Sequence, residues 1–165
     1  MKILNVEANN RKHQFEVHTR SQEYVFPYSK ADPVPSPTDG IVEAYVDPEL
    51  GREAFTYKLR SGIEGSIHID SVLEYNEDPS YLARLTMYQL TQIARSKFES
   101  SGLSSREVAR RLGTSPAQLY RLLDTTNYTK SLQQLFSLLY LFGYEIDVSI
   151  KERPRSKVVR RKQVA

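Results

Sequence analysis

The feature that most constrains this chain is an abrupt break between two short amphipathic segments at residues 104–124, SSREVARRLGTSPAQLYRLLD. Each segment begins with a serine that is followed three residues later by Glu or Gln. This is a capping-box pattern, which satisfies the first free amides of a helix. Gly113 stands between the segments, where a helix can end in left-handed backbone. The segment therefore predicts two helices joined by a turn of about three or four residues, a helix-turn-helix.

The spacing of three residues within this segment resembles that of a known family. Ala109 lies where the two helices would cross closely, Gly113 follows four residues later, and Leu119 comes six residues after that. This spacing is similar to that of the Cro/lambda-repressor-like (XRE) family over residues 80–143, and most closely over residues 104–124. Thr114, Pro116 and Ala117 depart from the residues that many members carry at these positions. The resemblance implies a lambda-repressor-like domain that binds DNA.

Charge divides the chain into two halves. The whole chain carries a net charge of +3, but residues 1–80 hold eight basic and fourteen acidic residues, a net charge of −6. Residues 81–165 hold fifteen basic and six acidic residues, a net charge of +9. Such asymmetry indicates two modules with different partners, and the basic module suits a polyanion. The alternative is that each half has only its own solvated surface.

The first half is typical of a β-rich domain. Phe15, Val17 and Thr19 alternate with polar residues, which predicts a half-buried strand, and about five or six such strands follow one another closely. We therefore expect an α+β protein, with a small, mostly antiparallel sheet domain of unknown role at residues 1–80. An all-α lambda-repressor-like domain would follow at residues 81–150. This layout resembles a small group of uncharacterised bacterial proteins, which carry no known activity to transfer.

The second half predicts further elements around the helix-turn-helix. A helix of some 22 residues should end at Gly102, and a later one should end at Gly143. The strict alternation of residues 144–150 predicts a strand. The tail, residues 151–165, carries seven basic residues and one Glu, and we expect it to be disordered beyond Pro154. The tail would contact phosphates or only make the chain more soluble.

The helix that ends at Gly143 has a predicted core stripe of Leu132, Leu135, Phe136, Leu139 and Phe142, which leaves Leu138 and Leu141 outside it.

Other classes of chemistry find little support in the sequence. The chain has no cysteine, and its histidines, His13, His18 and His68, lack the spacing of a metal site. No catalytic constellation accompanies them, so we expect no enzyme activity, no metal and no cofactor. The longest nearly apolar run, LFSLLYLFG, is far shorter than the roughly 20 residues of a membrane helix. We therefore expect a cytoplasmic protein without a membrane partner.

The function that these observations favour is regulation of transcription by sequence-specific binding to double-stranded DNA. Helix 115–124 would enter the major groove, with Arg121 the strongest candidate for reading a guanine. Gln118 has an alternative role as a helix cap, and Arg110 could belong to a solvated helix face. The expected DNA contacts are Ser115, Ala117, Gln118, Tyr120 and Arg121 on that helix, with Arg106, Arg110, Asn127, Tyr128 and Lys130 near phosphates.

The sequence also indicates protein partners. We expect a homodimer that uses Leu138, Leu141 and strand 144–150, although these residues could instead dock on the sheet of residues 1–78. A second interpretation is an antitoxin-like protein, whose acidic N-terminal domain binds a partner protein while the helix-turn-helix autoregulates its operon. An enzyme that uses the β-rich domain is a third interpretation, for which no set of catalytic residues is found.

Overall fold

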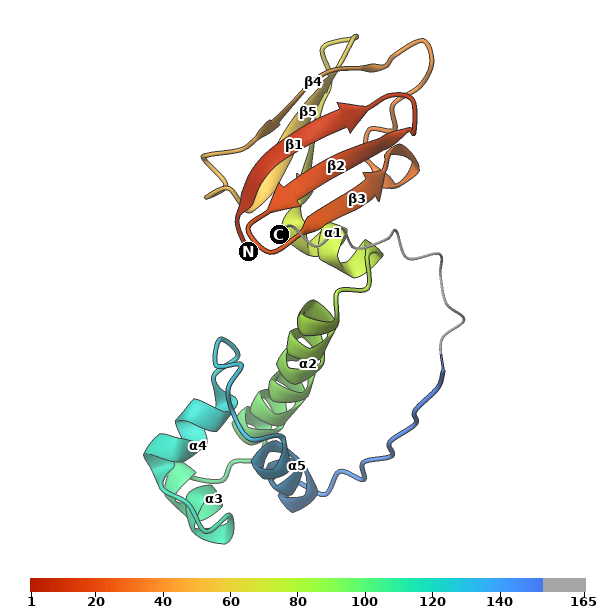
Figure 1. Ribbon diagram of the computed structural model, residues 1–165. Helices are drawn as coiled ribbons and strands as arrows, with labels where there is room; N and C mark the ends of the chain where they lie inside the picture. Colours follow the sequence, from red (N-terminus) through yellow and green to blue (C-terminus); the bar gives the residue numbers. More distant parts are fainter. Residues whose placement is uncertain (153–165) are drawn as a thin grey trace. The chain divides into compact units, whose positions relative to one another are not determined.

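The computed structural model describes residues 1–152, which divide into two compact units (Figure 1). Unit 1 runs from Met1 to Tyr81, and unit 2 begins at Leu82. Unit 1 contains all six described strands, and the residues from Leu82 onward form helices and irregular segments. The tail beyond residue 152, predicted to be disordered, lies outside the described residues.

The strands of unit 1 are short and antiparallel, and they are arranged in two sheets of three strands. The first sheet has the order β1-β2-β3, and the second has the order β4-β5-β6. The elements are β1 (Ile3–Asn9), β2 (Gln14–Thr19), β3 (Glu23–Pro27), the short 3₁₀ helix η1 (Tyr28–Lys30), β4 (Ile41–Val46), β5 (Ala54–Leu59), β6 (Glu64–His68) and α1 (Ile69–Tyr75).

The predicted fold class, a domain with one antiparallel sheet followed by an all-α domain, is wrong. The protein is α+β, but its strands form two separate three-stranded sheets interleaved with helices. The physical reason lies in the proline-rich stretch between β3 and β4. Proline lacks an amide donor and fixes its own backbone, so this stretch cannot continue the hydrogen-bonded ladder of the first sheet. The chain therefore leaves β3 through η1 and begins a second sheet at Ile41.

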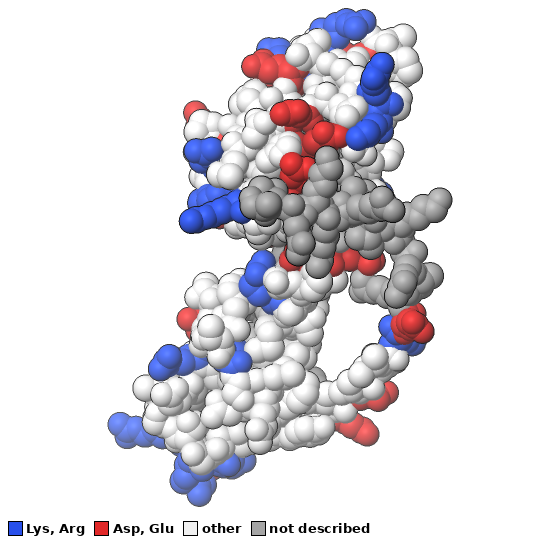
Figure 2. Space-filling view, in the orientation of Figure 1, with Lys and Arg blue, Asp and Glu red and all other residues white. Residues whose placement is uncertain are grey.

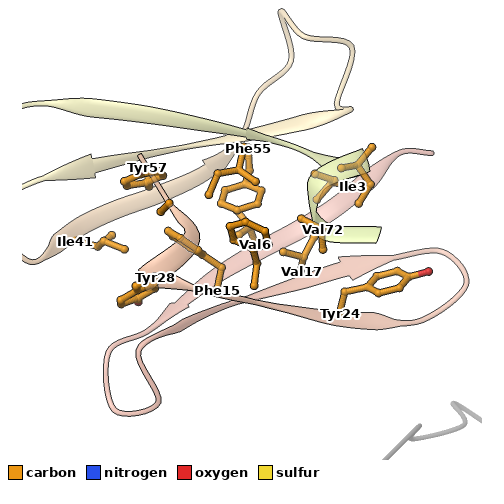
Figure 3. Packing of buried hydrophobic residues seen from close by; sticks show 14 of the residues in the cluster. Ile3, Val6, Phe15, Val17, Tyr24, Tyr28, Ile41, Phe55, Tyr57 and Val72 are labelled. Carbon is orange, nitrogen blue, oxygen red and sulfur yellow. The ribbon is translucent and has the colours of Figure 1, made fainter. Parts of the chain in front are cut away.

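One hydrophobic core joins the two sheets of unit 1 (Figure 3). Phe15 projects from β2 of the first sheet and contacts aromatic rings from the second. Its ring centroid lies 4.9 Å from that of Phe55 and 5.1 Å from that of Tyr57, both on β5. Tilted pairs at these distances add to the hydrophobic gain of burying the rings. Helix α1 contributes to the same core through Ile69, Val72 and Leu73.

Close packing around Tyr57 requires a glycine on the neighbouring strand. The Tyr57 hydroxyl donates a hydrogen bond of 2.6 Å to the carbonyl of Pro33, and burial raises the Tyr57 pKa to about 12. Gly65 on β6 lies directly opposite Tyr57 in the strand register. A Cβ atom at Gly65 would overlap the Tyr57 hydroxyl and lie 2.7 Å from the carbonyl oxygen of Asp32. The absence of a side chain at position 65 therefore makes room for the buried phenol.

We predict that Gly65→Ala lowers the free energy of unfolding of unit 1 by about 1–3 kcal/mol, because the added methyl group overpacks this site. Gly40→Ala is the control, since its Cβ would meet only the Ser36 carbonyl oxygen, at 3.8 Å. Urea unfolding followed through the amide NMR signals of β5 and β6 measures both variants. Equal stability of the two variants would show that Tyr57 can move without cost.

Unit 2 is built around four helices, the first of which starts before the unit boundary. These are α2 (Pro79–Ser100), α3 (Ser105–Arg111), α4 (Pro116–Leu123) and α5 (Leu132–Leu141). In the described part of the chain, residues 144–150 pair with no strand, so the predicted strand is wrong there. Alternation favours extended backbone, but a strand also needs a neighbour to accept its hydrogen bonds.

The hydrophobic core of unit 2 consists of Ala94, Val108, Leu119, Leu122, Leu123, Leu135, Leu138 and Leu139.

The predicted core stripe of α5 is right for Leu135 and Leu139 but wrong for Leu132 and for the exclusion of Leu138. Leu138, expected outside the core, is 0% exposed, whereas Leu132, expected inside, is 44% exposed. The buried side of α5 runs through Leu135, Leu138 and Leu139. The apolar sequence LQQLFSLLYL permits either face, because both contain leucines at helical spacing. Packing against the other helices decides between the faces. Leu138 is therefore not available to a dimer interface.

Candidate nucleic-acid interface

The helix-turn-helix is fixed by two serine caps and one left-handed glycine. The Ser104 hydroxyl accepts a hydrogen bond of 3.2 Å from the Glu107 amide, and the Ser115 hydroxyl accepts one of 3.2 Å from the Gln118 amide. Gly113 has φ +66°, a conformation that costs glycine little and other residues more. The amide of Thr114 donates to the carbonyl of Ala109 and closes the turn. These local contacts place α3 and α4 where the sequence predicted two helices.

The two helices pack through small and aliphatic side chains. Val108 and Ala109 of α3 are buried, as are Leu119 and Leu122 of α4. A small residue such as Ala109 permits close approach of the two backbones. This packing uses one side of α4 and leaves the opposite side outside the core.

The outer side of α4 carries the residues that were predicted to read bases. Ser115, Ala117, Gln118 and Arg121 are all exposed, and Tyr120 is 57% exposed. Ser115 nevertheless uses its hydroxyl as a helix cap. Gln118 contributes its backbone amide to that cap, so its side-chain amide is not needed for this bond. The helix therefore presents a guanidinium, a carboxamide and a phenol on neighbouring turns.

Basic side chains gather around α3 and α4. Figure 2 shows blue Lys and Arg side chains along this part of unit 2, at the lower left of the view. Arg106, Arg110 and Arg111 on α3 are exposed, as is Arg121 on α4. A surface of this kind attracts polyanions over distances of about a Debye length.

One acidic residue moderates the charge of this surface. The Glu107 carboxylate accepts two hydrogen bonds from Arg110, of 2.8 and 3.1 Å, and one of 2.7 Å from Arg111. These bonds, first those of Arg110 and then that of Arg111, lower the Glu107 pKa to about 2. Glu107 therefore stays ionised at neutral pH and cancels one of the two positive charges. In a complete capping box this carboxylate would accept from the Ser104 amide, whereas in the structure it accepts from the two arginines.

Lys130 is half-buried in unit 2 and is hydrogen-bonded to its neighbours. Its ammonium donates to the Leu122 carbonyl at 2.9 Å, to the Thr91 hydroxyl at 3.0 Å and to the carbonyl of Asp124. An ammonium has three donors, so these bonds occupy all of them. Burial lowers the Lys130 pKa, and the nearby Asp124 carboxylate opposes that shift. The group predicted to contact phosphate thus ties the end of α4 to α2.

The other predicted phosphate contacts beyond α4 divide into two kinds. Asn127 donates a hydrogen bond of 3.1 Å to the Arg121 carbonyl and accepts two from Thr129, so its side chain organises the loop after α4. Tyr128, in contrast, has an exposed side chain.

A polar hollow of about 170 Å³ is lined by four of the predicted residues, namely Gln118, Arg121, Asn127 and Lys130.

The geometry includes two roles that sequence reasoning missed. The pairing of Glu107 with Arg110 and Arg111 has a local signal, because residues three and four apart share a helix face. The role of Lys130 has none, since Thr91 lies 39 residues away in sequence.

Comparison with known proteins gives no match: no family model, no curated protein and no solved structure is similar to this chain. In residues 1–152, no helix combines the length and the apolar composition that crossing a membrane requires. The same residues contain no group of three or more His, Asp or Glu side chains placed to hold a metal ion.

We predict that Lys130→Met lowers the free energy of unfolding of unit 2 by about 1–3 kcal/mol, because two carbonyls at the end of α4 lose their charged donor. Lys97→Met, at an exposed position on α2, is the control and should change stability by less than about 0.5 kcal/mol. Urea unfolding followed through the amide signals of α4 and α5 compares them. Equal stability of the two variants would mean that the ammonium makes no net contribution.

Proposed function

We propose that this protein is a sequence-specific, double-stranded DNA-binding protein that regulates transcription. The observation that carries the proposal is the exposed outer side of α4, held by a capped, tight turn within an arginine-rich surface. B-DNA's major groove admits an α-helix and displays a distinct donor and acceptor pattern for each base pair. The resemblance of residues 104–124 to the XRE family points to the same function and supplies no further residue roles.

In this proposal Arg121 reads sequence and α3 positions the protein. The Arg121 guanidinium can donate two hydrogen bonds to O6 and N7 of a guanine, and Gln118 can pair with an adjacent adenine. Arg106 and Arg110 contact phosphates, which orient the helix without specifying sequence. Lys130 and Asn127 act indirectly, because their bonds hold the end of α4. The active species is a homodimer acting in the cytoplasm, since one eight-residue helix contacts few base pairs.

We predict that Arg121→Ala weakens binding to the preferred site by about 1–3 kcal/mol and relaxes discrimination at one base pair. Selection from a random duplex pool identifies the site, and titrations between about 50 and 200 mM salt should show a steep loss of affinity. Arg95→Ala is the control, because Arg95 lies on α2 and pairs with Glu99 at 2.9 Å.

Two outcomes would contradict this assignment. Failure of the unmodified protein to bind any duplex at low salt would remove the proposed function. Equal weakening of all sequences by Arg121→Ala would leave DNA binding intact but assign Arg121 to phosphate contact.

We further predict that Glu107→Gln strengthens binding to all DNA sequences alike, by roughly two- to five-fold at low salt, because Arg110 and Arg111 lose their competing carboxylate. The salt dependence should also become steeper. Glu99→Gln is a closely matched control. Glu99 also pairs with an arginine, Arg95 on α2, and its replacement by Gln removes the same negative charge. If both variants raised affinity equally, the effect would come from net charge and not from the Glu107 pairing.

A second candidate function is an antitoxin-like role, favoured by the net charge of −6 on residues 1–80. Unit 1 would then bind a basic partner protein while α4 binds the operator of the shared operon. A neighbouring gene for a small basic protein that forms a complex on co-expression would support it. Without such a complex, unit 1 has no role of this kind.

A further inference from the structure

The outward face of the first sheet of unit 1 carries acidic side chains. Glu7 on β1 and Glu16 on β2 stand directly opposite each other in the strand register, and Glu23 on β3 lies on the same side of the sheet. The three strands contain no Lys or Arg. Figure 2 shows red carboxylate side chains in the middle of the visible face of unit 1, over these strands. The surface formed by Glu7, Glu16 and Glu23 is called the acidic face below.

Glu16 is held in its ionised form by its neighbours. The hydrogen bond from the Asn9 side chain lowers the Glu16 pKa most, and those from Lys12 and Gln14 lower it further. Desolvation of the carboxyl group opposes these bonds without cancelling them. The face therefore keeps a negative charge at its centre at neutral pH, although Lys12 shares that charge.

Glu7 and Glu23 pair with no Lys or Arg in the part of the chain that the structure describes. Glu7 accepts a hydrogen bond of 3.0 Å from the neutral side-chain amide of Asn5, and Glu23 lies 3.3 Å from Nδ1 of His18. Like charges directly opposite each other on two strands, such as Glu7 and Glu16, lower stability. Cationic groups over the acidic face would relieve this repulsion.

The C-terminal tail supplies cationic groups at a matching spacing. Residues 153–165 carry six basic residues and no acidic one. Arg153, Arg155 and Lys157 occupy every second position, so in an extended chain they point to one side at intervals of about 6.5 Å. Opposite residues of two paired strands are about 5 Å apart, and diagonal neighbours are about 7–8 Å apart. The row of carboxylates across the three strands has similar intervals.

We infer that the tail, residues 153–165, docks across the acidic face of its own chain. The tether favours the tail over a separate basic protein, because a linked segment acts at an effective concentration of order millimolar. The length of chain is sufficient. Residues 144–157 span about 46 Å when extended at roughly 3.3 Å per residue, whereas α2, which joins the two units, is about 33 Å long.

The consequence for DNA rests on the proposed function. A tail that is bound to the acidic face is not available to phosphates, so the face would restrain charge-driven binding that does not depend on sequence. Duplex DNA would compete for the same basic side chains and release the tail. The docking itself needs no DNA and can be tested without it.

The first experiment locates the tail with a spin label on the full chain. The chain has no cysteine, so Ser156→Cys provides a single attachment site for a nitroxide, between two basic residues. At low salt the label should broaden the amide NMR signals of β1, β2 and β3 more than those of β4, β5 and β6. Salt at 1 M, where the Debye length is about 3 Å, should remove the broadening. Isotope-labelled chain without the nitroxide, mixed with nitroxide-labelled chain, should show none, because the contact lies within one chain.

Two matched double variants test the charge pairing. Glu7→Gln with Glu23→Gln removes two exposed carboxylates from the acidic face and should abolish most of the broadening. Glu16 stays in place, because its hydrogen bonds hold side chains at the turn between β1 and β2. Glu43→Gln with Glu64→Gln is the control, since it removes the same charge from exposed positions of the second sheet. The control should keep the broadening, and unchanged signals of the buried core show that both variants are folded.

The contrary outcomes are distinct. Absence of broadening at low salt, equal broadening of both sheets, or broadening in the mixed sample would overturn the inference. An equal effect of the two double variants would also overturn it, because net charge and not the acidic face would then attract the tail. Where the tail is docked, excess duplex DNA should sharpen the signals of the first sheet. A docked tail in a chain that binds no duplex would confirm the docking and remove the proposed function.

Discussion

One half-buried ammonium group, that of Lys130, holds the end of α4. Lys130 bonds to carbonyls at the end of α4 and to the Thr91 hydroxyl on α2, so it connects two helices that are remote in sequence. A positive charge at a helix C-terminus is also favoured by the helix dipole. Burial opposes this by disfavouring the charged form, and it lowers the Lys130 pKa. Hydrogen bonding to all three donors offsets this penalty, and α4 is held while its outer side stays exposed.

Fixing the helix in this way would serve the proposed reading of bases, because a contact to a base requires a defined position of the side chain. A bidentate contact from Arg121 to guanine requires the helix to enter the groove at a defined depth and angle. Asn127 contributes by donating to the Arg121 carbonyl, the backbone group of the same residue that would read the base. The arginine side chains near α4, in contrast, are held less rigidly than α4 itself. Arg110 and Arg111 are exposed and share one carboxylate, so their positions can adjust to a phosphate backbone.

The sequence predicted those parts of the structure that local rules decide. Ser104, Gly113 and Ser115 define the ends of α3 and α4 through backbone geometry within a few residues, and each lies where expected. The sequence analysis predicted one sheet where the structure has two, because strand pairing depends on contacts that are remote in sequence. The buried face of α5 was predicted only in part, with Leu138 missed, because leucines occupy both sides of that helix. The hydrogen bonds of Lys130 could not be predicted for a related reason, since its partner Thr91 lies 39 residues away in the sequence.

The composition of α5 shows how the two surfaces of unit 2 constrain each other. A unit that binds a polyanion gains affinity from basic residues on its surface, and α2, α3 and α4 all carry arginine. Exposed Leu132 and Tyr140 instead cost solubility, because an uncovered apolar face promotes association. Both features are compatible because the arginines and these two exposed apolar side chains lie on different helices of the unit.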